Sequence, residues 1–353
     1  MYTTPPMRIL DAALNRAGEG LRVLEDYVRF VLDDPFLTGQ IKSLRHEFAA
    51  TAGQIPTPDR HAARDTDRDV GTAISHHSET SRDDAWGVCA ASFKRTEQSL
   101  RSLEEYGKLL DEEFAKKIES LRYRLYTLEK AVDVGRSSRD RLEGVRLCVL
   151  VDGGNSASEF ERLIGELVEA GTGMIQLRDK RLDDHELIAR ARQLRQVTRG
   201  TRTLSIVNDR SDIAAAVHAD GVHLGQEDLA VKDARAIVGT RALIGVSTHN
   251  IEQARTAVLD GANYLGAGPT FPSQTKVFDQ FAGLDYLREV AAEIRLPTFA
   301  IGGITAQNLR EVLSAGISKA AVGAAITQAN TPSVAIHELL SILNEASATA
   351  LGV

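Results

Sequence analysis

The sequence predicts an α/β fold, a (β/α)8 TIM barrel preceded by an all-α helical bundle domain. Two observations lead to this prediction. The first part of the chain shows only helical periodicity, whereas the second part alternates short apolar segments with amphipathic helical ones. A length of 353 residues also exceeds that of a typical single domain. We therefore expect a helical bundle over 1–132, a linker over 133–144 and a barrel over 145–353.

The predicted bundle consists of two related helical hairpins. The first helix, expected over 8–32, has apolar side chains every three or four residues: Leu10, Leu14, Ala17, Leu21, Leu24, Val28 and Val31. The same spacing returns about 79 residues later: Cys89, Phe93, Thr96, Leu100, Leu103, Gly107 and Leu110. Each copy is followed by a second helical segment with matching residues, 41–45 and 118–122. The polar stretch 53–87 between the copies is expected to be a loop.

The predicted barrel contains eight strands, each followed by a helix-like segment. The strands are expected at 145–152, 174–180, 204–209, 221–226, 243–248, 264–270, 297–302 and 319–323. Helical patterns include 159–170, 186–197, 251–259, 308–315 and 334–346. Eight such units in series favour a closed barrel, and a doubly wound open sheet is the alternative. The small and charged residues of 133–140 predict the linker before the first strand.

Composition excludes several functional classes. A net charge of −7 and an isoelectric point near 5.8 argue against general nucleic-acid binding. Two cysteines far apart, Cys89 and Cys148, predict a reducing environment without a disulfide framework. No signal-peptide pattern and no run long enough to span a bilayer are present, so we expect a cytoplasmic protein that does not bind membranes.

The second predicted strand ends in a cluster of cations. Side chains alternate between the faces of a strand, so Gln176, Arg178 and Lys180 should share one face while Leu177 and Asp179 share the other. In a parallel barrel this strand end lies at the mouth where ligands bind, and two cations there suit a phosphate or diphosphate. The alternative is a strand end that frays into a solvated loop.

Other strand ends supply the carboxylates and amides of the same mouth. Asn208 and Asp209 end the third strand, Asp228 follows the fourth, and Ser247 lies near the end of the fifth. Asp209 and Asp228 are suited to share one Mg²⁺, which prefers a few carboxylates together with phosphate oxygens and water. Helix capping is the alternative role for both.

Two loops are candidates for binding a phosphate group. Gly302 and Gly303 follow the seventh strand and are expected to open a helix, where backbone amides can hold an anion. The loop after the sixth strand offers hydroxyls, an amide and an ammonium: Ser273, Gln274, Thr275 and Lys276. The alternatives are a tight turn for the glycines and a hydrophilic lid for the second loop.

The motifs at these strand ends, taken together, resemble those of the thiamine-phosphate synthases over about 147–326. They are Gln-Leu-Arg-Asp-Lys at 176–180, Asn-Asp at 208–209, His-Leu-Gly-Gln-Glu-Asp at 223–228, Gly-Val-Ser at 245–247, Gly-Pro-Thr-Phe-Pro at 268–272 with Thr-Lys at 275–276, and Ala-Ile-Gly-Gly-Ile at 300–304. The resemblance implies condensation of 4-amino-2-methyl-5-hydroxymethylpyrimidine diphosphate with 4-methyl-5-(2-phosphoethyl)thiazole, or its carboxylate. The products would be thiamine phosphate and diphosphate.

The resemblance also implies roles for single residues. It places six side chains around the pyrimidine diphosphate: Gln176, Arg178, Lys180, Asn208, Ser247 and Lys276. Leu177, Asp179 and Gln274 belong to the same binding segments, and Asp209 and Asp228 would ligate Mg²⁺. The thiazole phosphate would lie on Ser273, Thr275 and Gly303 and on the backbone near Gly323 and Ala324. Ser273 stands where threonine is usual, and Gly323-Ala324 replaces an aliphatic-Ser pair, which removes one side-chain donor.

The implied mechanism is dissociative, so the protein must stabilise departing diphosphate rather than provide a nucleophile. We expect the catalytic residues to be Arg178, Lys180, Lys276 and Ser247. One alternative is a thiazole tautomerase of the same barrel family, with His249 as its acid-base group. Another is a non-catalytic sensor of a thiamine precursor. The N-terminal helices carry no catalytic motif, and we expect them to mediate homo-oligomerisation or to cover the barrel.

Overall fold

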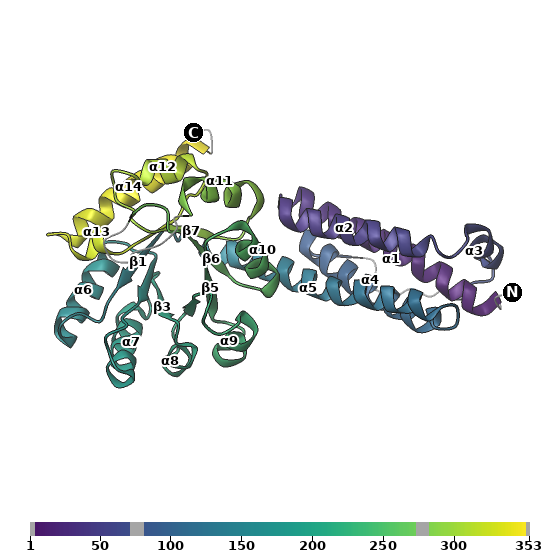
Figure 1. Ribbon diagram of the computed structural model, residues 1–353, viewed down its shortest axis with the longest axis horizontal. Coiled ribbons are helices and arrows are strands. Elements are labelled where there is room, and N and C mark those ends of the chain that lie inside the picture. The colour runs from purple at the N-terminus through teal and green to yellow at the C-terminus, as the bar shows by residue number, and fades with distance from the viewer. Residues whose placement is uncertain (1–3, 71–80, 273–281, 351–353) are drawn as a thin grey trace. The chain divides into compact units, whose positions relative to one another are not determined.

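The computed structural model of the protein describes residues 4–70, 81–272 and 282–350 and confirms the predicted fold class (Figure 1). The chain divides into two compact units, Met1–Asp133 and Val134–Val353. The first is helical, and the second is a closed parallel barrel with surrounding helices. None of the helices within these described ranges is both long and apolar enough to cross a membrane.

Four long helices form the first unit. They are α1 (Thr4–Phe30), α2 (Pro35–Ala52), α4 (Ala85–Gly107) and α5 (Glu112–Leu142), with a short α3 (Thr57–Ala63) inside the stretch predicted as a loop. Helix α1 packs most extensively against α4. The two backbones approach so closely at Gly20 that a Cβ there would lie 2.1 Å from Thr96 Oγ1. Glycine at this position therefore sets the helix spacing.

Equivalent ion pairs join the two helices of each hairpin. Arg45 Nε on α2 donates to Glu25 Oε2 on α1 at 2.6 Å, and Arg122 Nε on α5 donates to Glu104 Oε2 on α4 at 2.8 Å. The alignment pairs Glu25 with Glu104 and Arg45 with Arg122. The repeat thus includes these polar contacts as well as the apolar positions.

The segment that we predicted as a linker, residues 133–144, is helical as far as Leu142. Its small residues fit a helix because the hydroxyls of Ser137 and Ser138 donate to the Val134 carbonyl. Leu142 is completely buried and packs in the barrel core. The apolar end of the helix, rather than the polar composition of its middle, therefore determines this conformation.

The second unit is a barrel whose strands pair in chain order, which excludes the open-sheet alternative. The strands are β1 (Leu147–Val151), β2 (Met174–Leu177), β3 (Leu204–Asn208), β4 (Gly221–Leu224), β5 (Leu243–Thr248), β6 (Tyr264–Ala267), β7 (Thr298–Ile301) and β8 (Ala320–Val322). Every neighbouring pair is parallel, and β8 closes on β1. Most strands are shorter than predicted, whereas β5 has the predicted bounds.

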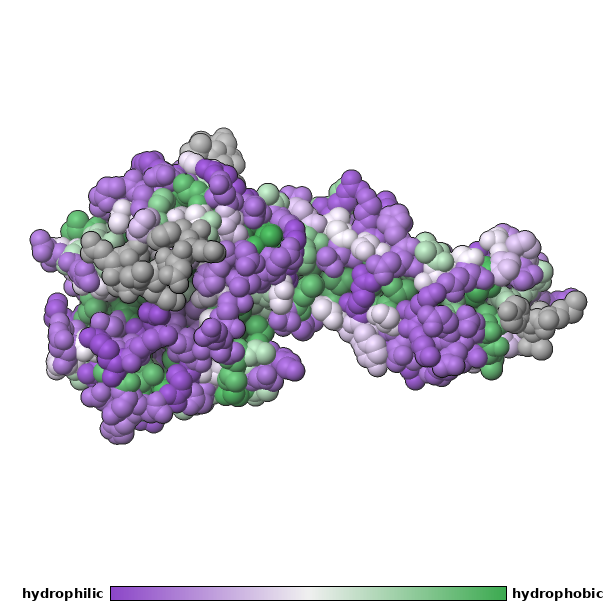
Figure 2. Space-filling view, viewed as in Figure 1, coloured by the Kyte–Doolittle hydropathy of each residue, from purple (hydrophilic) through white to green (hydrophobic). Residues whose placement is uncertain are grey.

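Helices follow the strands around the barrel. They are α6 (Ala157–Glu169), α7 (Asp184–Thr198), α8 (Ser211–Ala216), α9 (Val231–Val238), α10 (Ile251–Asp260), α11 (Gly283–Glu293), α12 (Leu309–Ser314), α13 (Ala324–Thr327) and α14 (Pro332–Ala350). Their outer faces carry the charged residues, and the visible surface of the barrel is largely hydrophilic (Figure 2).

The barrel interior changes from apolar to polar along the strands. A cluster near their beginnings contains Met174, Ile206, Leu243, Tyr264 and Phe299. Residues two positions apart face the same side of a strand, so the same interior face continues into polar groups. These are Gln176 on β2, Asn208 on β3, His223 on β4 and Ser247 on β5. The apolar layer therefore supports a polar layer at the carboxyl ends.

Candidate active site

An amide and two cations occur at the end of β2, but only the amide lies on the strand, which ends before the predicted Lys180. Gln176 is buried, and its Nε2 donates to Asn208 Oδ1 on β3 at 2.6 Å. The strand ends at Leu177, which is 1% exposed. Arg178 is half-buried and its amide donates to Val151 O at 2.8 Å, while Lys180 is exposed. Both cations therefore lie on the loop after β2 rather than on the strand.

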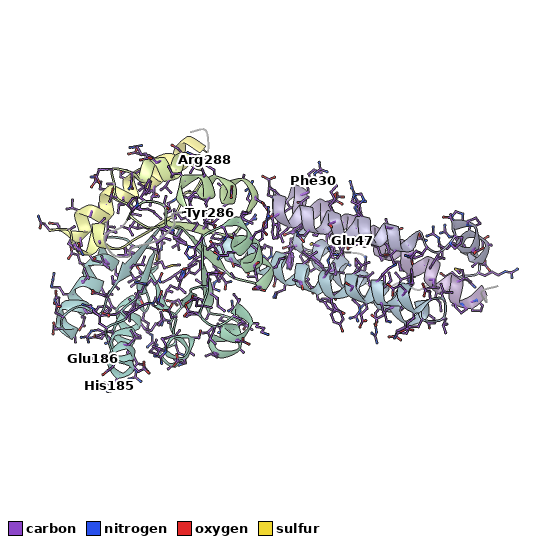
Figure 3. The ribbon with its side chains drawn as sticks, viewed as in Figure 1. Phe30, Glu47, His185, Glu186, Tyr286 and Arg288 are labelled. Atoms are coloured by element: carbon purple, nitrogen blue, oxygen red, sulfur yellow. The ribbon has the colours of Figure 1, made fainter. Side chains whose placement is uncertain are left out.

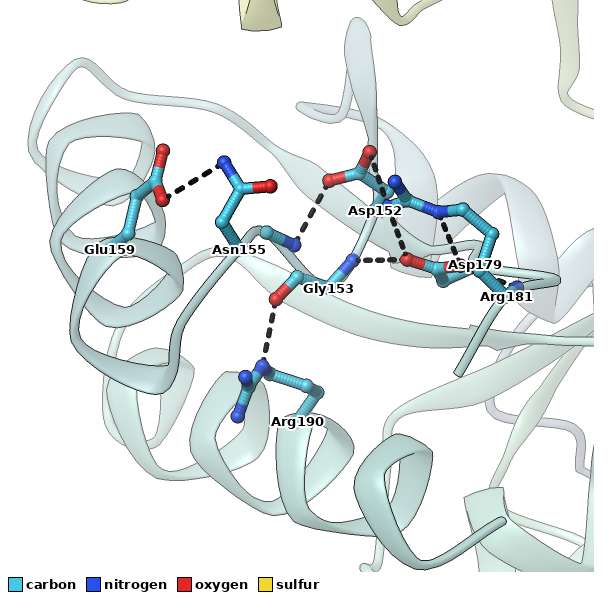
Figure 4. Close-up of polar contacts among 8 residues, drawn as sticks. Asp152, Gly153, Asn155, Glu159, Asp179, Arg181 and Arg190 are labelled. Carbon is cyan, nitrogen blue, oxygen red and sulfur yellow. Dashed lines mark hydrogen bonds and ion pairs between the residues drawn. The ribbon is translucent and has the colours of Figure 1, made fainter. Parts of the chain in front are cut away.

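Asp179 is held within the protein (Figure 4). Its Oδ2 accepts from the Gly153 amide at 3.0 Å and from Arg181 Nη2 at 2.8 Å. The side chain is 1% exposed, and the Arg181 guanidinium holds the pKa of this carboxyl well below its usual value. Arg190 Nε in turn donates to Gly153 O at 2.7 Å. Asp179 therefore joins the loops after β1 and β2 and braces the segment that carries Arg178.

Two carboxylates meet at the ends of β3 and β4. The Asp209 amide donates to His223 O at 2.8 Å, and Asp228 Oδ2 accepts from the Gly225 amide at 2.6 Å. Burial, and then the contact with Asp228, raise the pKa of Asp209 to about 6, while the charges of Lys180 and Arg178 act in the opposite direction. The structure thus places Asp209, Asp228 and the two cations of the β2 loop within electrostatic range.

The backbone at Asp209 supports a specialised role. Its φ is +61°, in the left-handed region that residues other than glycine rarely adopt. Such a conformation persists only where its surroundings hold it, and it occurs frequently at functional sites. At Asp209 this conformation is held by the hydrogen bond from its amide to the His223 carbonyl on β4.

The carboxylate pair has the chemistry of a magnesium site. Two facing carboxyl groups repel when both are ionised, and a divalent cation relieves that repulsion. Within the described ranges, no three His, Cys, Asp or Glu side chains are grouped as a metal cage. Mg²⁺ is commonly bound by one or two carboxylates with phosphate oxygens and water. The pair therefore fits this ion better than a closed structural metal site.

A buried histidine stands beside Ser247, and sequence reasoning had given it no role. His223 Nε2 lies 2.9 Å from Ser247 Oγ, and Nδ1 lies 3.2 Å from the Tyr264 phenol oxygen. Burial lowers the pKa of His223 to about 4. A Cβ at Gly245 would lie 2.1 Å from Tyr264 Cζ and 2.5 Å from His223 Nδ1. The sequence did contain a signal for this contact, because a glycine inside a strand indicates the close approach of another group.

The double glycine after β7 differs from its prediction. Gly302 and Gly303 do not open a helix directly, because a turn separates them from α12. Their φ values are +98° and +64°, and a Cβ at Gly303 would lie 2.4 Å from Pro272 O. Glycine is therefore required for contact between the loops after β6 and β7.

Of the remaining predicted residues, the structure describes Gly323 and Ala324. Gly323 precedes α13, whose first residue is Ala324, and the Gly323 carbonyl accepts from the amides of Ile326 and Thr327 at 2.9 and 3.1 Å. Ser273, Gln274, Thr275 and Lys276 lie outside the described residues.

Comparison with known proteins agrees with this architecture. Residues 147–326 match the family described as thiamine monophosphate synthase, and residues 8–131 match the ThiD2 family. A thiamine-phosphate synthase of Rhodopirellula baltica is 45% identical over 329 residues, covering 91% of this chain and 88% of that protein. One of Thermosynechococcus vestitus is 41% identical over 344 residues, covering 96% and 95%.

A solved structure matches a smaller part of the chain. The thiamine phosphate pyrophosphorylase of Pyrococcus furiosus is 36% identical with a TM-score of 0.51, and the match covers 57% of this chain and 96% of that one. The long curated relatives, in contrast, extend over both units. From its barrel, its strand-end motifs and these relatives, the chain belongs to the thiamine-phosphate synthase family.

Proposed function

We propose that this chain condenses 4-amino-2-methyl-5-hydroxymethylpyrimidine diphosphate with 4-methyl-5-(2-phosphoethyl)thiazole, or its carboxylate, to give thiamine phosphate and diphosphate. The observation that carries the proposal is the grouping of the Asp209–Asp228 pair with Arg178 and Lys180 at the ends of β2, β3 and β4. Such a grouping is suited to a metal-bound diphosphate. The family membership supports the same reaction.

Asp209 and Asp228 would hold Mg²⁺, which when bound neutralises charge on the diphosphate. Arg178 and Lys180 supply further positive charge beside the departing group, in a position fixed by the Asp179 brace. Gln176 and Asn208, already hydrogen-bonded to each other, form a polar floor suited to orienting an aminopyrimidine. We assign the thiazole phosphate to Gly303, to the backbone at Gly323 and Ala324, and to the segment 273–276.

No side-chain nucleophile is required by this reaction. The carbon–oxygen bond to diphosphate breaks first, and the electron-rich aminopyrimidine carries the resulting positive charge. The thiazole nitrogen then forms the new carbon–nitrogen bond. The chain's own contribution is to stabilise the leaving group and to align the second substrate.

The test is the Arg178→Ala variant, assayed for thiamine phosphate and released diphosphate with both substrates. Removal of a preorganised charged donor is expected to lower kcat at least about a hundredfold. Arg162→Ala on α6, whose side chain is 72% exposed, is the control for the loss of a surface cation, and its kcat should equal that of the wild type. Turnover of Arg178→Ala close to that of the wild type would contradict the proposal.

A thiazole tautomerase is the second candidate, and the same assay separates it. His249 is exposed, its Nδ1 contacts Gly268 O, and its amide donates to Gln253 Oε1 at 2.7 Å. Proton transfer within the thiazole needs neither the carboxylate pair nor two cations. Isomerisation of the thiazole phosphate without the pyrimidine substrate, and without diphosphate release, would favour that activity.

A further inference from the structure

A hydrogen-bonded row of three side chains crosses the polar layer of the barrel. Tyr264 comes from β6, His223 from β4 and Ser247 from the intervening β5. Tyr264 and His223 are 2% and 5% exposed, whereas Ser247 is half-buried at the carboxyl end. The row therefore connects the closed interior with the mouth, and only its last member, Ser247, is among the expected catalytic residues.

The row has room only because two strand residues are glycines. At Gly245, any side chain would collide with both Tyr264 and His223. At Gly266 on β6, a Cβ would lie 3.1 Å from His223 Cε1. Glycine inside a strand weakens the sheet. The two glycines beside the His223 ring therefore indicate that room for this ring is made at the expense of sheet stability.

The direction of the hydrogen bonds follows from counting donors. A buried, uncharged imidazole has one donating and one accepting nitrogen. Within the described part of the chain, the Tyr264 phenol hydrogen-bonds only to His223 Nδ1. If Nδ1 carried the proton, the phenolic hydrogen would be left buried without an acceptor, which is unfavourable. Tyr264 therefore donates to Nδ1, and the ring proton resides on Nε2.

We infer that His223 and Tyr264 are positioning residues that turn the Ser247 hydroxyl into a hydrogen-bond donor toward the substrate. With its proton on Nε2, His223 donates to Ser247 Oγ. The serine hydrogen then cannot point at the ring and is directed to a ligand in the mouth. This inference rests on the proposed function and on the expectation that Ser247 lies beside the pyrimidine diphosphate.

The first measurement is the protonated ring nitrogen, read by ¹⁵N NMR of histidine-labelled protein without substrates. The His223 signals are assigned among the nine histidines by their loss in His223→Gln. We expect the Nε2-protonated form in the wild type and a mixture in Tyr264→Phe, which removes the donor to Nδ1. An Nδ1-protonated ring in the wild type would overturn the inference.

The second measurement is kinetic. Tyr264→Phe removes one buried oxygen that does not touch substrate, and kcat should fall about three- to tenfold, as for loss of one hydrogen bond. In a Ser247→Ala background the same change should alter kcat by less than about twofold, because the hydroxyl to be oriented is gone. An equal loss in both backgrounds, or no loss in either, would refute the inference.

Tyr286→Phe is the matched control. Tyr286 lies on α11 (Figure 3), is 4% exposed, and its phenol donates to Thr248 Oγ1 at 2.6 Å, one residue beyond Ser247. The Tyr286→Phe variant therefore loses a comparable buried hydrogen bond outside the row, and its kcat should stay within about twofold of wild type.

The two measurements also separate this inference from the proposed function. If wild-type protein formed no thiamine phosphate, the proposed function would fail, whereas the nitrogen spectrum would still decide the direction of the hydrogen bonds.

Discussion

At the scale of single residues, Asp209 combines several unfavourable features. Its carboxyl faces Asp228, its backbone adopts φ of +61°, and its pKa is raised to about 6. None of these features stabilises the protein without a ligand. Each is consistent with a group arranged for a cation.

The pH dependence of metal-free stability tests this interpretation. Because the folded-state pKa of Asp209 is raised, its favourable protonation is fully present below about pH 4 and is lost as pH rises through about 6. Asp209→Asn removes this titration. Since the group is half-buried, we expect the variant to be more stable than wild type by about 1 kcal/mol at pH 7.5, and by less at pH 5. Thermal unfolding in a chelator measures the difference.

Addition of Mg²⁺ should reverse that order. Millimolar Mg²⁺ is expected to raise the unfolding temperature of the wild type but not that of Asp209→Asn, since a ligand stabilises only a protein that binds it. A metal-free wild type that gains stability relative to the variant between pH 5 and 7.5 would contradict the assigned carboxylate pair.

At the scale of elements, the repeated hairpins depend on buried Arg–Glu contacts. Glu104 is 6% exposed at its side chain and accepts from Arg122 at 2.8 Å and from Arg101 at 2.7 Å. The Arg122 guanidinium also lies 4.7 Å from the centre of the Tyr123 ring. A charge so enclosed is costly when its partner is removed.

We therefore expect Glu104→Ala to destabilise the helical unit by about 3 to 5 kcal/mol. The neighbouring Glu105 provides the control, because its pairs with Arg101 and Lys108 are exposed and its removal should cost less than about 1 kcal/mol. Hydrogen exchange of the backbone amides in α4 and α5 measures the loss of stability in both variants. Equal protection in the two variants would show that the buried pair has no special contribution.

Helical periodicity and the repeat predicted these elements well, but their ends were less predictable. The polar composition of 133–140 indicated a linker, yet the burial of Leu142 in the barrel core continues α5 to that residue. Conversely, the predicted second strand extended to Lys180, whereas bonds from Asp179 to Gly153 and Arg181 direct the chain into a loop. The local sequence pattern does not show these contacts with distant residues, so it does not predict where such an element ends.

At the scale of the whole molecule, the end of α5 belongs structurally to the barrel unit. Asn263 Nδ2 donates to Ser138 Oγ at 2.9 Å, and Lys319 Nζ donates to Leu142 O at 2.6 Å and Val145 O at 2.7 Å. Residues 147–326, which match the thiamine monophosphate synthase family, lie entirely within this unit.

A fragment starting at Val134 is therefore expected to fold and to retain kcat/KM within about twofold of the full chain. A fragment starting at Gly144 should be less stable by about 3 to 5 kcal/mol, since it loses buried Leu142 and the hydrogen bond to Asn263. Synthase assays and denaturant unfolding compare the two. Equal stability would show that the last turns of α5 are dispensable.

Periodicity was enough to predict the two-unit architecture and the closed barrel, because these depend on which face of a helix or strand a residue occupies. Beyond the pair Asp209–Asp228, which the sequence already led us to expect, only the tertiary structure decided which groups meet: Asp179 with Gly153, and His223 with Ser247 and Tyr264. Such contacts depend on strand register and barrel closure, which bring together residues from separate strands and loops. The periodic sequence pattern therefore predicted the barrel, and closure of the barrel brought polar residues from separate strands and loops into contact.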